Sequence, residues 1–125
     1  MYWTDFEPHG VLQHFYGDVS GEERLAGLTV LLDDRRTALA RYVIIDFTGA
    51  AGIAMSYSQM ETLVSLMNST LASVNPDVLL VYVLEGEAAQ AHFQRVLDVA
   101  PIRHVGHVGR TLDEARDWIA GHVPA

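Results

Sequence analysis

The chain has 125 residues, half of them apolar, which is enough material for one domain with a hydrophobic core. Sixteen acidic residues outnumber eight arginines, and the formal net charge of −8 argues against a general nucleic-acid binder. The absence of cysteine excludes disulfides and thiol catalysis, and the absence of lysine excludes Schiff-base, pyridoxal-phosphate and P-loop chemistry. We therefore expect a single acidic domain over residues 1–125.

The first sixteen residues predict a β-hairpin. Residues 2–6 are rich in aromatic side chains and end at a Pro-His-Gly turn. Residues 11–16 then alternate, with Val11, Gln13 and Phe15 on one face and Leu12, His14 and Tyr16 on the other. Two antiparallel strands joined by the turn account for both patterns.

The next segment predicts a helix followed by a buried strand. Ser20 and Glu23 have the spacing of a capping box, and leucines at helical spacing follow until the pattern fades over residues 33–36. Residues 42–45 are continuously apolar, as in a strand that is covered on both faces, and the run stops at Asp46. Residues 48–52 are small and are expected to form a loop.

The second half predicts three more helices and two more strands. An apolar stripe over residues 60–74 indicates a helix, which Ser58 and Glu61 cap, unless Ser56 and Gln59 cap it one turn earlier. Residues 78–84 form a second buried strand, residues 87–99 a helix, and residues 103–108 a short strand. Thr111 and Glu114 start the last helix. This order predicts an α/β layered fold, with a mixed, mostly parallel sheet of about five strands and four helices.

Carboxylates follow both buried strands, where such sheets usually place their functional residues. Asp46 and Glu85 could together hold a hard cation such as Mg²⁺, although solvated loop acids explain them more simply. The histidines do not form a metal motif, because His104 and His107 fall on opposite faces of the expected strand. We expect no metal and no cofactor.

The sequence contains no recognisable catalytic motif. Gly49 and Gly52 lack the third glycine of a dinucleotide fingerprint, and there is no nucleophile elbow. Ser56 and Ser58 are explained as helix caps. A sharper interpretation is phosphorylation of an exposed hydroxyl at the helix N-terminus, where the helix dipole stabilises the added charge.

Two segments resemble the SpoIIAA-like (STAS/SEC14-type) family of small bacterial proteins, which is related to the anti-sigma-factor antagonists. They are the strand and loop over residues 42–49, followed by the helix of Ser56, and the terminal helix over residues 111–119. The resemblance implies the STAS fold, and it places Ser56 at the phosphorylated position of the antagonists. Met55 and Tyr57 stand where that signature has a serine and a glycine.

These observations lead to two functional hypotheses. The first is a non-enzymatic regulatory module that binds a protein of the kinase or anti-sigma type through a loop containing Asp46, Thr48, Gly49, Ser56, Tyr57 and Ser58. The alternative is a carrier of an apolar small molecule or lipid, based on the adaptable side chains of Met55, Met60 and Met67. No signal peptide or membrane span is apparent, so a cytoplasmic location is expected, and a homodimer is plausible.

Overall fold

A computed structural model describes residues 1–123. Its main sheet has the strand order β1-β2-β4-β6-β7, in which β1 is antiparallel to β2 and the other neighbours are parallel. The strands are β1 (Tyr2–Phe6), β2 (Gly10–Phe15), β4 (Tyr42–Asp46), β6 (Leu79–Val83) and β7 (Val105–Gly109). The opening hairpin and the mixed, mostly parallel five-stranded sheet are therefore as predicted.

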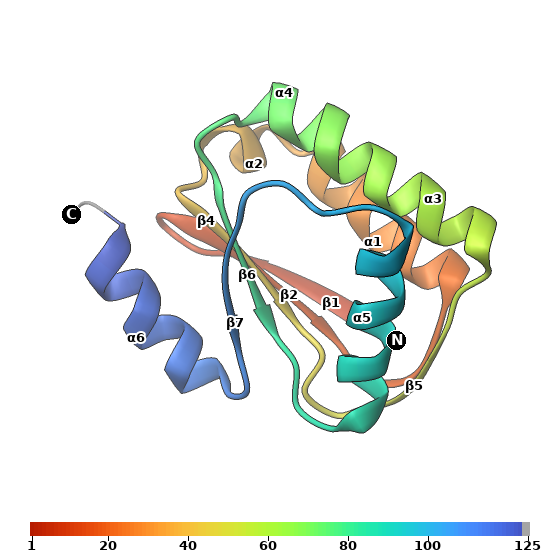
Figure 1. The fold of residues 1–125 in the computed structure, drawn as a ribbon. Coiled ribbons are helices and arrows are strands. Elements are labelled where there is room, and N and C mark those ends of the chain that lie inside the picture. Colours follow the sequence, from red (N-terminus) through yellow and green to blue (C-terminus); the bar gives the residue numbers. More distant parts are fainter. Residues whose placement is uncertain (124–125) are drawn as a thin grey trace.

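Helices cover both faces of this sheet, which is why its central strands are apolar throughout. Helices α1 (Gly21–Asp33), α3 (Tyr57–Ser65) and α5 (Glu87–Val99) lie on one face, and α6 (Leu112–His122) lies on the other (Figure 1). In β4, Val43 and Ile45 join the core under the three helices, while Ile44 joins the smaller core under α6. All five residues of β4 are buried. The continuous run of apolar residues thus serves two cores at once.

A second, small sheet forms where we expected only a loop. Strand β3 (Gly17–Ser20) pairs in parallel with β5 (Ala50–Ala54), so the prediction of a loop over residues 48–52 is wrong in its second half. Small residues have little intrinsic strand preference, and here the pairing with β3 decides the conformation. The turn before β5 is made by Gly49, whose φ of 84° favours glycine.

The first helical region contains one helix more than predicted. The side chain of Ser20 caps α1 by accepting a hydrogen bond from the backbone N–H of Glu23, as the sequence indicated. Asp34 then caps the additional helix α2 (Arg35–Leu39), and a hydrogen bond from the Arg36 side chain lowers the pKa of Asp34 to about 2. Residues 1–123 therefore form five helices, if the unbroken helical run over residues 57–74 is counted as one helix.

That run begins at Tyr57 and changes its winding in the middle. Ser56, and not Ser58, is the N-cap, and it forms a capping box with Gln59. A π-helical segment η1 (Leu66–Leu71) and the short α4 (Ala72–Val74) continue the helix. The side chain of Asn68 in η1 bonds the carbonyl of Pro101 and the N–H of Arg103. The widened turn therefore fastens the helix to the loop that precedes β7.

The C-terminal third follows the prediction closely. Helix α5 has the expected bounds, and Thr111 caps α6 by accepting a hydrogen bond from the N–H of Glu114. The last strand starts two residues later than expected, because His104 adopts a left-handed φ of 67° in the preceding turn. His104 and His107 are thus not on opposite faces of one strand: only His107 belongs to β7, where its ring stacks on Trp118 of α6.

One ion pair ties α6 to the opening hairpin. Arg116 donates two hydrogen bonds to Glu7, at 2.6 and 2.5 Å, and the Tyr42 hydroxyl donates a third to the same carboxylate. The hydrogen bond from Arg116 lowers the pKa of Glu7.

Within the part of the chain that the structure describes, no helix has both the length and the apolar character needed to cross a membrane.

Candidate functional site

The carboxyl ends of the parallel strands surround a hollow of about 280 Å³. Strands β4 and β6 are neighbours in the sheet, as predicted, so Asp46 at the end of β4 and Glu85 just beyond β6 line the same hollow. The start of α6 forms the opposite wall. The lining residues are His14, Asp46, Thr48, Glu85, Thr111, Leu112 and Asp113.

His14 and Asp46 form the central contact of the hollow. The Nδ1 atom of His14 lies 3.0 Å from Oδ2 of Asp46, while Oδ1 of Asp46 accepts hydrogen bonds from the N–H and the hydroxyl of Thr48 at 2.8 and 2.5 Å. Asp46 is almost fully buried, and His14 is partly exposed. A carboxylate held in this way fixes the orientation of the imidazole and leaves its Nε2 atom free of the pair.

Sequence reasoning did not propose His14 as a site residue, although a signal was present. His14 and Asp46 occupy the same register position of β2 and β4. The alternation along β2 places His14 on the face opposite Val11 and Phe15. If the strand that ends in Asp46 were known to be the parallel neighbour of β2, the contact of His14 with Asp46 would follow. What the sequence could not show is that β2 and β4 are adjacent, because β3, α1 and α2 separate them along the chain.

Two aromatic side chains stack with the ring of His14. Its ring stacks with Trp3 of β1 at 5.1 Å and with Tyr16 at 5.7 Å between ring centroids. Trp3 is 46% exposed, and α6 packs against β4, β6 and β7 on this face of the sheet. The edge of the face formed by β1 and β2 therefore presents these rings to solvent.

The polar groups of the hollow are mostly engaged in holding the local structure. Thr48 donates its hydroxyl to Asp46, and the Thr111 hydroxyl accepts the capping hydrogen bond of α6. Among residues 1–123, no three histidine or acidic side chains come together in an arrangement that could hold a metal ion. The arrangement can orient an imidazole and attract a cation, since Asp46, Glu85 and Asp113 contribute three carboxyl groups.

The second part of the predicted site is the turn at the start of α3. Ser56, Tyr57 and Ser58 are all exposed, and the side chain of Tyr57 has 63% of its surface open to solvent. The capping box fixes this turn, and Gln59 of the box packs against Gly21, where any side chain on residue 21 would collide with it. A rigid turn therefore presents an aromatic ring beside two hydroxyl groups.

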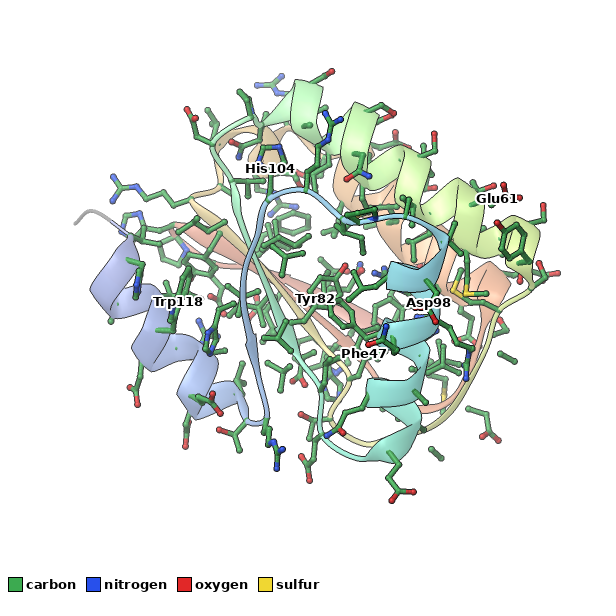
Figure 2. All side chains as sticks on the ribbon, viewed as in Figure 1. Phe47, Glu61, Tyr82, Asp98, His104 and Trp118 are labelled. Atoms are coloured by element: carbon green, nitrogen blue, oxygen red, sulfur yellow. The ribbon has the colours of Figure 1, made fainter. Side chains whose placement is uncertain are left out.

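The structure separates the predicted loop into two places. Asp46 and Thr48 line the hollow, and Gly49 lies in the exposed turn after them, but Ser56, Tyr57 and Ser58 do not line it. Strand β5 intervenes between the two groups. The helix α3 runs along the outer side of the molecule, and its Glu61 points to solvent (Figure 2). The turn from Met55 to Ser58 is thus a surface of its own, which we call the α3 turn.

The methionines that suggested an apolar ligand are part of the packing. Met60 and Met67 are buried in the core under α1, α3 and α5, and Met55 packs against its edge. The hollow at the carboxyl ends is lined by none of them.

In comparisons with known proteins, no family model, no curated protein and no solved structure matches this chain.

Proposed function

We propose that the protein is a non-enzymatic regulatory module, which binds a protein partner through the α3 turn. The observation that carries the proposal is the exposure of Tyr57 on a turn that the capping box of Ser56 and Gln59 holds rigid. Tyrosine is enriched among the residues that dominate binding energy at protein interfaces. A rigid exposed ring loses little conformational entropy when a partner covers it.

The charges around the turn indicate what kind of partner fits. Two exposed glutamates lie near the turn. Glu61 follows it on α3. Glu22 lies in the first turn of α1, which is close because Gly21 of α1 contacts Gln59. Arg24, in the first turn of α1, is buried, and the first turn of α3 contains no basic residue. The partner surface should therefore carry basic residues around a pocket for the tyrosine ring.

Ser56 is the residue through which such binding is regulated in this proposal. Its hydroxyl oxygen accepts the N–H of Gln59 at 3.1 Å, and the side chain is exposed. A phosphate at this oxygen could take over the hydrogen bond and would be stabilised by the helix dipole. The added negative charge beside Tyr57 would change the binding surface without disturbing the core. A protein kinase is thus the class of enzyme expected to act here.

The test compares the proteins that variants retain from a lysate of the native host. We expect Tyr57→Asp to lose a partner that the wild type retains, because a charged side chain cannot fill an aromatic pocket. Ser56→Asp should change the amount retained. Leu39→Asp is the matched control, since Leu39 is exposed in α2, away from the α3 turn. If all three variants retain what the wild type retains, the α3 turn is not the binding surface.

The pair of His14 and Asp46 supports a second candidate function, the binding of a small cationic molecule in the hollow. Three carboxyl groups and one oriented imidazole line this space, and α/β folds commonly bind ligands at the carboxyl ends of their strands. Screening small amines and diamines by NMR should shift the resonances of Thr48, Glu85 and Asp113, and His14→Gln should weaken the shifts. Binding that leaves these resonances unmoved would rule out the hollow.

A further inference from the structure

The core under α1 and α5 contains an arginine without a carboxylate partner. Arg24 of α1 is only 1% exposed, and no acidic side chain in residues 1–123 lies within ion-pair distance of it. Its Nε and Nη1 atoms are buried and donate no hydrogen bond. The guanidinium instead lies 5.2 Å from the ring of Phe15 and 5.6 Å from that of Phe47.

Other buried polar atoms near Arg24 also have no partner. They are the hydroxyl of Tyr82 on β6 and Nδ1 of His92 on α5. The Tyr82 hydroxyl lies close enough to the guanidinium to interact with it, both electrostatically and through side-chain hydrogen bonding, although the contact lacks the geometry of a regular hydrogen bond. His92 packs edge-on against Phe47, the same ring that Arg24 approaches. Figure 2 shows Tyr82 and Phe47 together in the layer between the sheet and α5.

The neighbouring groups cannot neutralise the charge of Arg24. Burial raises the pKa of the Tyr82 hydroxyl, which therefore stays protonated and neutral. Burial, together with the positive charge of Arg24, lowers the pKa of His92 to about 3, so the imidazole is also neutral. The attraction between an aromatic ring and a buried cation is weaker than the cost of burying an unpaired charge. Within residues 1–123, no other group therefore compensates the positive charge of Arg24.

We propose that Arg24 binds a small inorganic anion of the chloride class inside the protein. The guanidinium donates from Nε and Nη1, and the Tyr82 hydroxyl donates a further hydrogen bond to the anion. His92 can add another in the tautomer that carries its proton on Nδ1. Gln13, whose Oε1 atom is likewise buried without a partner, can only accept at that atom and so is not a ligand. This site lies in the interior and is independent of the α3 turn.

The test measures thermal unfolding at constant ionic strength while chloride replaces gluconate, which is too large for a packed interior. An anion that binds only the folded state raises the unfolding temperature. Between about 10 and 500 mM chloride we expect a rise of at least about 3 °C for the wild type. Arg24→Met should remove this rise and should be at least as stable as the wild type in gluconate, because no charge remains buried.

A control variant, a second ligand variant and a crystallographic measurement make the result decisive. Arg110→Met removes an exposed arginine and should leave the chloride effect unchanged. If Arg24→Met does not fold, Tyr82→Phe removes one ligand and should reduce the rise. Crystals soaked in bromide should show an anomalous peak beside the guanidinium of Arg24. Equal unfolding temperatures in chloride and gluconate, an undiminished rise in Arg24→Met or Tyr82→Phe, or the lack of that peak would overturn the proposal.

Discussion

At the scale of single residues, the polar groups inside the core determine how the protein responds to pH. His92 is 2% exposed, and its burial depresses the pKa of the imidazole from 6.5 to about 3. Between these two values the unfolded chain binds a proton that the folded protein does not, so unfolding is favoured as the pH falls. The contribution of His92 is constant above pH 6.5 and is lost progressively below it.

We predict that His92→Leu has a flatter pH profile of stability than the wild type. Between pH 6.5 and about 3, the free energy of unfolding of the wild type should fall by up to about 1.4 kcal/mol per pH unit more than that of the variant. Denaturant unfolding at several pH values measures this difference. His9→Leu, which changes an exposed histidine, should keep the wild-type slope. Parallel profiles for His92→Leu and the wild type would show that His92 is not buried in its neutral form.

The ion pair of Glu7 and Arg116 joins two residues that are far apart in the sequence, and we predict how much it contributes to stability. Arg116→Ala leaves the carboxylate of Glu7, which is only 13% exposed, without its main partner. We expect a loss of about 1–3 kcal/mol in urea unfolding, with partial recovery in Arg116→Lys, which cannot donate two parallel hydrogen bonds.

The exposed pair of Arg36 and Asp34 is the matched comparison for this contact. Arg36→Ala should cost clearly less than Arg116→Ala, because its ion pair is open to solvent. Equal losses in Arg116→Ala and Arg36→Ala would contradict the structural role given to Glu7.

At the scale of elements, the sequence was most informative where periodicity and capping agree. The bounds of α5 follow from its apolar stripe and from the proline after it, and the strands β4 and β6 follow from their uninterrupted apolar runs. Strand β5 was missed because alanine and glycine carry no strand signal, and only its partner β3 makes it a strand. The cap of α3 was ambiguous because Ser56 and Ser58 both have a suitable residue three positions later.

Close packing between elements predicts opposite effects for two glycine-to-alanine substitutions. A Cβ atom on Gly10 of β2 would overlap the ring of Tyr42 on β4, whereas one on Gly121 of α6 would meet open space. Gly10→Ala should therefore destabilise the protein by about 1–3 kcal/mol. Gly121→Ala should stabilise it by up to about 1 kcal/mol, because alanine favours the helix. Thermal unfolding of both variants tests the contact, and a neutral Gly10→Ala would show that β2 and β4 are less tightly packed.

At the scale of the whole molecule, the order of elements predicted the sheet and the neighbouring positions of Asp46 and Glu85. It did not predict the contact of His14 with Asp46 or the interior position of Arg24. An arginine in the first turns of an amphipathic helix looks like a surface residue, and only the packing of α1 on Phe15 and Phe47 makes it part of the core. The division of the predicted loop into a hollow and the α3 turn likewise depends on the pairing of β5 with β3.

The central claim, that the α3 turn binds a protein partner, is tested most directly by photo-crosslinking from individual exposed apolar positions. A benzophenone amino acid replaces, in separate variants, one of four large apolar residues that the structure leaves exposed: Val30, Leu39, Tyr57 and Val108. After irradiation in a lysate of the native host, we predict a discrete crosslinked protein from position 57 that is absent from positions 30, 39 and 108. Crosslinks of equal yield from all positions, or none from position 57, would contradict the account.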